Sequence, residues 1–242
     1  MNISGNKILI TGGASGIGFG FAERFVKEGN TVIICGRRQE TLKEAKEKIP
    51  ALITYACDIS SEEGRKKLFA WIQKEHPDLN VLMNNAGIQN WMKVSDESFF
   101  ELAKQELAIN VEAPLQLTQL FINLRSLHII MNVTSGLSFV PLIKVPVYCA
   151  TKAFFHSFTL SLRALLKEKN IEVIEVIPPA LNTDLGGKGL HDQAPPVSDF
   201  IESIFVQLKE GKTELTFGLS EQLSKASAEG VQQIFARMNQ LG

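Results

Sequence analysis

The sequence predicts a single α/β domain, doubly wound, in which a mostly parallel sheet is flanked by helices on both faces. Three observations support this prediction. Short apolar runs rich in β-branched residues alternate with longer amphipathic stretches, which is the pattern of repeated βαβ units. The length of 242 residues suits one large domain, and no linker divides residues 1–242. A glycine-rich turn follows the first apolar run, as at the strand ends of such sheets.

Seven short apolar runs are predicted as strands. Most are apolar on both faces, as expected where helices cover both sides of a sheet. The first ends at Thr11, just before the glycines, and the fifth ends two residues before Ser135. The predicted strands are residues 7–11, 31–35, 52–56, 81–84, 128–133, 171–177 and 214–217.

The predicted helices lie between these strands, where apolar residues recur at helical spacing. Gly29 and Asn30 end the first helix, and Ser60 with Glu63 forms a capping box for the third. The predicted helices are residues 16–28, 39–48, 62–76, 98–121, 147–169 and 199–209, with a further helix at 228–239.

Two regions depart from this alternation. Residues 184–198 carry three glycines and two prolines, and we expect either a lid over the substrate or a permissive surface loop. Residues 219–242 form a C-terminal tail that packs on the domain or on a second subunit.

Composition narrows the classes of function. A formal net charge of −1 without a basic stripe argues against nucleic acid as a partner. No apolar run of about eighteen residues predicts a membrane span, and residues 1–7 contain no apolar signal sequence. The three cysteines, Cys35, Cys57 and Cys149, are odd in number and lack metal-ligand spacing. We therefore expect free thiols, no bound metal and a cytoplasmic protein. With nucleic acid and membrane partners disfavoured, we expect the partner to be a small molecule.

A dinucleotide site is predicted at the glycine-rich turn. Glycines at positions 12, 16 and 18 permit a tight turn, close approach of the backbone to a pyrophosphate, and close contact between helix and sheet. The helix that starts near Gly16 presents free N–H groups and a partial positive charge to phosphates.

The end of the second predicted strand indicates which nicotinamide cofactor binds. An acidic residue there pairs with the ribose 2′-hydroxyl of NAD, whereas arginine accommodates the 2′-phosphate of NADP. The chain reads Cys35-Gly36-Arg37-Arg38, and both arginines can hold a phosphate. We predict NADP(H) over NAD(H). The alternative is that the two arginines are solvated residues at the start of the next helix.

Tyr148 and Lys152 are spaced to share one face of a helix. A neighbouring ammonium group favours the phenolate and is expected to lower the tyrosine pKa from about 10 towards the working range. The tyrosine can then exchange a proton with a carbonyl or alcohol oxygen, and Ser135, just past the fifth strand, can hydrogen-bond the same oxygen.

Asn110 lies in a long helical pattern, four residues before Pro114. Proline cannot donate to the carbonyl at i−4, so the Asn110 carbonyl is expected to be free for a water that connects Lys152 to solvent. The alternative is a helix kink without a relay.

These motifs together resemble the classical short-chain dehydrogenase/reductase family. The resemblance spans residues 5–185, and the chain is similar to the bacterial subgroup compared with the oxidoreductase of the D-alanyl-lipoteichoic acid operon. The matching positions are Thr11-Gly12-x-x-x-Gly16-x-Gly18, Asp58, Asn84-Asn85-Ala86-Gly87, Asn110, Ser135, Tyr148-x-x-x-Lys152 and Pro178 to Thr183.

The resemblance implies a Rossmann-type sheet of seven strands and a catalytic tetrad of Asn110, Ser135, Tyr148 and Lys152. It also implies a homodimer or homotetramer built on residues 98–121 and 147–169. With the two arginines included, the cofactor contacts are Gly12, Ala14, Ser15, Gly16, Ile17, Gly18, Arg37, Arg38, Asp58, Ile59, Asn85, Ala86, Gly87, Tyr148, Lys152, Pro178, Leu181 and Thr183.

Three departures from the family pattern concern cofactor and substrate. Ser15 stands where many NADP-preferring members carry a basic residue, which leaves Arg37 as the main phosphate anchor. Pro179 replaces the usual glycine after Pro178. Residues 123–127 form a short connection, and the predicted lid lacks a long apolar helix. The last two bear on substrate size and shape.

Residues 89–92, 137–142 and 185–194 are expected to line the substrate pocket. Trp91 and Phe139 would offer it a flat apolar surface, or they are ordinary packing residues. Two other functions use the same fold. One is an NADP(H)-binding redox sensor without chemistry, which has no need of the tetrad. The other is a sugar-nucleotide epimerase, although those enzymes resemble longer chains with different glycine spacing.

Overall fold

The computed structural model describes residues 1–240, and within them seven strands form one parallel sheet in the order β3-β2-β1-β4-β5-β6-β7. The predicted doubly wound α/β fold is therefore confirmed. Every predicted strand is present, with its ends within one residue of the expected position. The strands are β1 (Lys7–Thr11), β2 (Thr31–Gly36), β3 (Ile53–Ala56), β4 (Val81–Asn84), β5 (Ile129–Val133), β6 (Glu172–Ile177) and β7 (Glu214–Thr216).

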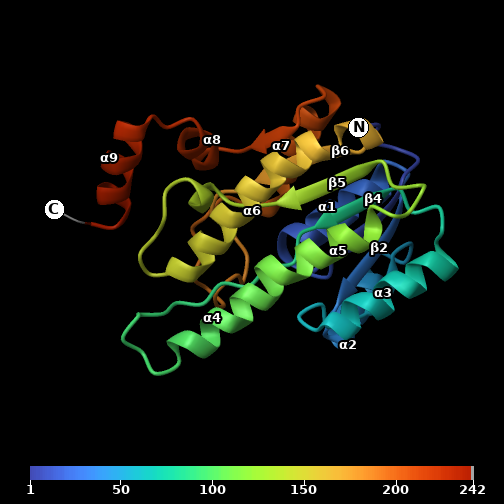
Figure 1. Ribbon diagram of the computed structural model, residues 1–242, viewed down its shortest axis with the longest axis horizontal. Helices are drawn as coiled ribbons and strands as arrows, with labels where there is room; N and C mark the ends of the chain where they lie inside the picture. The colour runs from blue at the N-terminus through green and yellow to red at the C-terminus, as the bar shows by residue number, and fades with distance from the viewer. Residues whose placement is uncertain (241–242) are drawn as a thin grey trace.

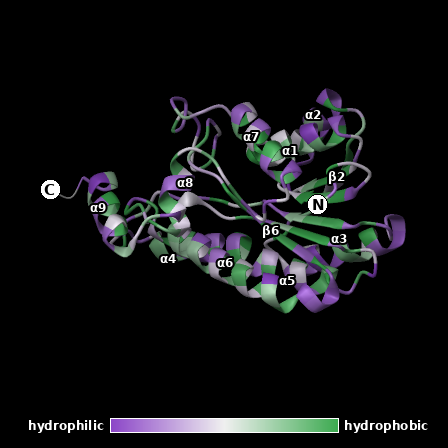
Figure 2. Ribbon diagram, turned by 90° about the horizontal axis from the view of Figure 1, so that it is seen from above, coloured by the Kyte–Doolittle hydropathy of each residue, from purple (hydrophilic) through white to green (hydrophobic). Residues whose placement is uncertain are grey.

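Helices cover both faces of the sheet (Figures 1 and 2). On one face lie α1 (Gly16–Lys27), α2 (Gln39–Lys48) and α7 (Val197–Lys209), packed on the strands through one hydrophobic cluster. On the other lie α3 (Glu62–Glu75), α5 (Ala113–Phe121) and α6 (Pro146–Leu165), packed through a second cluster. Strands buried from both sides explain why their sequences are apolar without alternation.

The long helix predicted over residues 98–121 contains a change of helix type. It consists of α4 (Phe99–Leu107), a π-helical turn η1 (Ala108–Glu112) and α5. Within η1, the Ala113 N–H donates to the carbonyl of Ala108, five residues back, instead of the usual four. Pro114 has no N–H to donate, so widening of the preceding turn is the local response to the proline.

Two helix ends also differ from the prediction. The cap of α3 is Ser61, whose hydroxyl accepts from Gly64 N–H at 3.0 Å, so the capping box predicted at Ser60 is wrong by one residue. The Ser60 N–H instead donates to Asp58 Oδ1 at 3.0 Å. The helix predicted to end at residue 169 ends at Leu165 and is followed by the 3₁₀ turn η3 (Lys167–Lys169).

The predicted lid and tail contain short helical elements. α7 begins at residue 197, so the last two residues of segment 184–198 are helical. The tail contains α8 (Leu219–Ser224), which the sequence pattern missed, and α9 (Ala228–Met238), which projects from one end of the molecule (Figure 1). Residues 241 and 242 of the predicted tail lie outside the described residues.

The sheet brings the candidate residues to one edge. Because parallel strands point the same way, the segments that follow β1, β4, β5 and β6 all leave the same edge of the sheet. β1 lies beside β4, although β2 follows β1 in the chain. Crevices at such a change of strand order are where doubly wound sheets bind ligands. Within residues 1–240, the structure contains no helix long and apolar enough to cross a membrane.

Candidate active site

The glycine-rich turn adopts a backbone conformation that favours glycine and leaves N–H groups free at the start of α1. Gly12 and Gly16 have φ of +64° and +53°, a left-handed conformation that side chains disfavour. A Cβ at Gly18 would overlap the Asn85 side chain and the Gly12 carbonyl. The Ser15 side chain makes no capping bond to α1, which leaves the N–H groups of the first turn of α1 for a ligand.

The segment after β4 is fastened to this turn. Thr11 Oγ1 accepts from the N–H groups of Asn85 and Ala86 at 3.0 and 3.1 Å. Asn85 Nδ2 donates to the carbonyls of Thr11 and Gly12 at 2.9 and 3.2 Å. The contacts hold the two predicted cofactor segments side by side, so Asn85 serves as a brace between them.

The loops after β2 and β3 carry four further predicted cofactor contacts. Arg37 and Arg38 are exposed after β2, and Asp58 is exposed after β3, while Ile59 is buried. The pKa of Asp58 is lowered, first by the hydrogen bond from Ser60 and also by the positive charge of Arg37. Arg37 therefore lies close to Asp58.

Arg65 was not singled out from the sequence, yet it shapes this loop. It is buried on α3 and donates to the carbonyls of Ile59 and Ser60 at 2.7 and 3.0 Å, and also to Gln116 on α5. The one hint in the sequence is that Arg65 shares a helix face with the apolar Leu68 and Ile72. The guanidinium fixes the loop that carries Asp58 and Ile59.

The segment after β6 contacts both the glycine turn and the loop after β5. Thr183 lies against the glycine turn, because a Cβ at Gly16 would be 3.5 Å from its methyl group. The Pro178 carbonyl accepts from Gly136 N–H at 3.0 Å, which ties this segment to the loop after β5. Leu181 is buried in the core below. Thr183 and Gly16 thus meet although 167 positions separate them in the chain.

Ser135, Tyr148 and Lys152 lie together and are almost fully buried. Lys152 Nζ is 5.7 Å from the centre of the Tyr148 ring and donates to the Val133 carbonyl at 2.8 Å. The Ser135 hydroxyl is in hydrogen-bonding reach of the phenol and lowers its pKa. The three residues predicted as a constellation are therefore neighbours.

The direction of the tyrosine pKa differs from the expectation. Burial raises the pKa of Tyr148 above its ordinary value, and only the Ser135 hydrogen bond opposes this. Lys152 does not offset the effect, because burial lowers its own pKa to about 8, so the lysine loses its charge before the phenol ionises at equilibrium. At neutral pH the phenol is therefore protonated.

Asn110 belongs to the same cluster through its side chain. Its Oδ1 accepts from Ile88 N–H at 2.9 Å, and its Nδ2 donates to the Ile88 carbonyl at 2.9 Å and to Thr151 Oγ1 at 3.1 Å. Thr151 Oγ1 in turn donates to the Tyr148 carbonyl at 2.7 Å. Asn110 therefore connects η1 to the loop after β4 and to the helix of Tyr148. The π-helical turn places this side chain.

Gly87 lies against two residues of the predicted tetrad. A Cβ at Gly87 would be 3.4 Å from Asn110 Oδ1 and 3.5 Å from Lys152 Nζ. Gly87 is therefore within contact range of both polar groups.

Glu106 is a buried acid beside the site that the sequence did not reveal. Its Oε1 accepts from Asn90 N–H at 2.6 Å, and its Oε2 has no hydrogen-bond partner. Burial raises the pKa of Glu106 to about 7. Its charge contributes to the raised pKa of Tyr148, which places the carboxyl near the phenol. It sits in an amphipathic helix, where an acid is expected on the solvent side.

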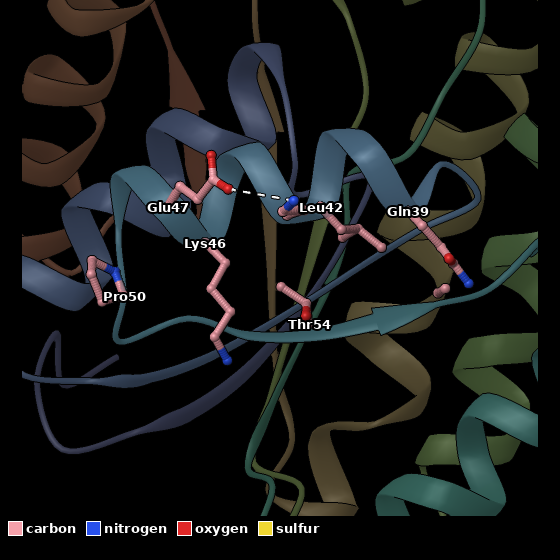
Figure 3. Close-up of a pocket in the computed structure, with 8 residues that line it drawn as sticks. Gln39, Leu42, Lys46, Glu47, Pro50 and Thr54 are labelled. Carbon is pink, nitrogen blue, oxygen red and sulfur yellow. Dashed lines mark ion pairs between the residues drawn. The ribbon is translucent and has the colours of Figure 1, made fainter.

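The three segments expected to line the substrate pocket meet near Tyr148. Leu137, Leu142 and Leu185 pack against the cluster that contains Tyr148. A Cβ at Gly186 would be 3.4 Å from Trp91 Nε1, so the predicted lid touches the loop after β4. The hollow in Figure 3 lies elsewhere, between α2 and β3, and no predicted site residue lines it.

Comparison with known proteins identifies the family. A model of the short chain dehydrogenase family matches residues 6–194 of this chain. The chain belongs to the short-chain dehydrogenase family. The predicted resemblance is thereby confirmed, and the parallel sheet with its flanking helices is the Rossmann-like, nucleotide-binding fold of this family.

Relatives of this dehydrogenase cover nearly its full length. It is 41% identical over 250 residues to the uncharacterized oxidoreductase DltE of Bacillus subtilis (strain 168), covering 99% of this chain and 98% of the relative. The predicted subgroup is confirmed. A short chain dehydrogenase of Burkholderia cenocepacia, solved in complex with NADP, superposes with a TM-score of 0.85 at 25% identity, covering 98% of this chain and 99% of the other.

A second solved structure shows that the fold does not select one cofactor. A short-chain dehydrogenase/reductase of Burkholderia phymatum, in complex with NAD, gives a TM-score of 0.78 at 16% identity, covering 89% of this chain and 90% of the other. The fold therefore accommodates both nicotinamide dinucleotides. Among residues 1–240, no three His, Cys, Asp or Glu side chains are grouped to hold a metal.

Proposed function

We propose that this dehydrogenase is an NADP(H)-dependent oxidoreductase that interconverts a carbonyl compound and an alcohol. The observation that carries the proposal is the burial of Ser135, Tyr148 and Lys152 together, with Lys152 Nζ against Gly87 in the loop after β4. A binding protein without chemistry has no use for a buried phenol beside a buried ammonium group. The experiment is a panel of carbonyl compounds with NADPH, in which oxidation of NADPH should accompany formation of the alcohol.

The residues present fit a dinucleotide. The left-handed Gly12 and Gly16 and the uncapped start of α1 offer the pyrophosphate a cradle without side chains. Arg37 takes the 2′-phosphate, Asp58 and Ile59 border the adenine, and Lys152 holds the nicotinamide ribose. The bound nicotinamide supplies or accepts the hydride. The remaining proposed contacts are Ala14, Ser15, Ile17, Gly18, Arg38, Asn85, Ala86, Gly87, Tyr148, Pro178, Leu181 and Thr183.

Tyr148 moves the proton in this proposal. Because its pKa is raised, the phenol is protonated at neutral pH and can donate to the carbonyl oxygen during reduction. Ser135 orients the same oxygen, and Lys152 stabilises the phenolate that remains. Asn110 fixes the Tyr148 helix through Thr151. Alcohol oxidation needs the phenolate, so its rate should rise as pH increases, whereas reduction should be fastest at neutral pH.

The cofactor preference depends on one exposed side chain. Arg37→Ala should weaken binding of NADPH by about thirtyfold, because a phosphate loses a charge-assisted hydrogen bond worth about 2 kcal/mol. NADH, which lacks that phosphate, should bind equally well to the parent and the variant. Titration of both nucleotides by fluorescence measures the difference.

Arg125→Ala is the matched control, because Arg125 is an exposed arginine outside the cofactor loops. It should leave both affinities unchanged. Equal affinities of the parent for NADPH and NADH would refute the role given to Arg37.

We infer a homodimer or homotetramer from the apolar face of α4 and α6. Phe100, Leu107, Phe154 and Leu165 are exposed there, and Leu165 is 71% exposed. Leu165→Glu should leave the fold intact and lower the mass in sedimentation equilibrium towards that of the 26.8 kDa chain. Val206→Glu, at an exposed position of α7, is the control and should keep the parent mass. A parent that sediments as a single chain would contradict the inference.

Two further parts of the proposal concern the surroundings of the site. Segment 184–198 acts as a substrate lid, since Leu185 packs beside Tyr148 and Gly186 against Trp91. Cys35, Cys57 and Cys149 are free and buried, in keeping with a reducing cytoplasm. The alternative function, a catalytically silent NADP(H)-binding redox sensor, predicts tight binding of NADPH and no turnover of any carbonyl.

A further inference from the structure

Glu175 is a fully buried carboxylate in the middle of strand β6. A charge at such a position is unfavourable unless it is paired and hydrogen-bonded. Its Oε1 accepts from Thr134 Oγ1 at 2.7 Å, and its two oxygens lie 2.9 and 3.1 Å from His156 Nδ1. The carboxylate therefore has two specific partners from different elements.

Those partners belong to the two segments that carry the proposed catalytic groups. Thr134 immediately precedes Ser135 after β5, and His156 follows Lys152 by one helical turn on α6. Glu175 thus bridges the strand end of Ser135 and the helix of Tyr148. The bond from Lys152 Nζ to the Val133 carbonyl joins the same two segments at a second point.

His156 also supports the chain between Ser135 and Tyr148. The Phe139 ring lies 4.5 Å from the His156 ring, centre to centre, at an angle of 58°. Phe139 follows the turn η2 (Gly136–Ser138), which Ser135 caps by accepting from Leu137 N–H at 3.1 Å. The His156 imidazole therefore contacts the Glu175 carboxylate, which hydrogen-bonds Thr134, and also Phe139 in the loop that follows Ser135.

The charges around His156 favour its protonated form. Its pKa is raised, first by the hydrogen bond to Glu175 and further by Glu214 on β7, whereas burial and Arg163 on α6 lower it. The pKa of His156 in the folded protein lies above its ordinary value. At pH below the ordinary value the imidazole is therefore protonated, and its ion pair with Glu175 is complete. It loses its positive partner as pH rises through the raised pKa.

We propose that Glu175 and His156 are positioning residues that set the direction of the Ser135 hydroxyl relative to Tyr148. The inference rests on the proposed oxidoreductase function for its kinetic consequences. Its structural part, the coupling of His156 to the backbone of Ser135, stands without turnover. Neither residue touches the reacting atoms; each acts through Thr134 and the loop after Ser135.

The test combines NMR with kinetics. In the parent, the backbone amide shifts of Ser135 and Gly136 should follow the same pH midpoint as the His156 ring. In Glu175→Gln, which keeps an acceptor for Thr134 and removes the charge, that dependence should vanish. For carbonyl reduction, kcat should fall about tenfold from lost alignment, with a smaller change in KM and an unchanged Kd for NADPH.

His156→Gln gives the same test at a partly exposed position, should the buried Glu175 variant fail to fold. Glu172→Gln on the same strand and His128→Gln at its exposed site are the matched controls and should behave as the parent. Constant Ser135 amide shifts through the His156 titration would overturn the proposal. So would variants that keep the parent kcat and pH profile while melting at lower temperature. If the parent protein turns over no carbonyl compound, the oxidoreductase proposal is refuted. The pH titration of the Ser135 amide still tests whether His156 is coupled to the Ser135 backbone.

Discussion

Tyr148→Phe is expected to lower kcat for carbonyl reduction by about 10³-fold, because it removes the proton donor and leaves the ring in place. Tyr148 is buried and its ring lies beside Lys152, so the loss of one oxygen should not disturb packing. The Kd for NADPH should stay within about twofold, since the glycine turn and Arg37 are untouched. Steady-state kinetics and a fluorescence titration measure the two quantities.

The chain contains only one other tyrosine, Tyr55 in β3, which stacks on Trp71 with ring centres 4.4 Å apart. Tyr55→Phe is therefore a matched control, and it should keep the parent kcat. Equal rates of carbonyl reduction by the Tyr148 variant and the parent would show that the phenol does not transfer the proton.

Lys152→Met is expected to lower kcat by about 10²- to 10³-fold and also to weaken NADPH binding, because the ammonium group serves both the phenolate and the ribose. Burial lowers the Lys152 pKa to about 8, so the charged form is present below that pH. In the parent, the rate of reduction should fall as pH rises through about 8, and the variant should lack this inflection.

The same substitution should raise stability at neutral pH. A lysine whose pKa is depressed in the folded state carries a penalty that is fully present below the folded pKa. That penalty disappears as pH rises towards the unfolded value, about 10.4. The shift corresponds to about 3 kcal/mol, reduced by about 1 kcal/mol for the lost bond to Val133.

Denaturant unfolding at pH 7 should therefore show Lys152→Met about 2 kcal/mol more stable than the parent, with the gain shrinking towards pH 10. Lys167→Met, at an exposed position just beyond α6, is the control and should change neither kcat nor stability. A destabilised Lys152 variant with parent activity would mean that the ammonium group is structural.

The features that the sequence could predict depend on local pattern. Apolar runs predicted the ends of the strands within one residue. The spacing of the glycines predicted the turn, and the structure shows Gly12 and Gly16 there in a left-handed conformation. The placement of Ser135, Tyr148 and Lys152 followed from their positions at a strand end and on one helix face. Each of these features depends on residues close together in the chain, so the sequence alone is enough to predict it.

The features that could not be predicted depend on contacts distant in the chain. Glu106 is fully buried in an amphipathic helix, and nothing in its neighbouring residues marks it as buried. Glu175 lies in a strand predicted to be buried, but its partners Thr134 and His156 come from distant parts of the chain. The raised pKa of Tyr148 results from the burial of the phenol, which sequence spacing does not report. Pro114 signalled a disturbance at Asn110, but the missing donor alone does not tell whether the helix kinks or widens into a π-helical turn.

The most direct test of the central claim is to follow the hydrogen that is transferred. NADPH deuterated at both positions of the nicotinamide C4 would be incubated with a carbonyl compound that the parent reduces, and the alcohol analysed by mass spectrometry and NMR. We predict one deuterium on the carbinol carbon of the alcohol made by the parent, and at most a trace of that alcohol from Tyr148→Phe. Alcohol without deuterium, or NADPH that binds tightly while the whole carbonyl panel stays unreduced, would contradict the proposed oxidoreductase.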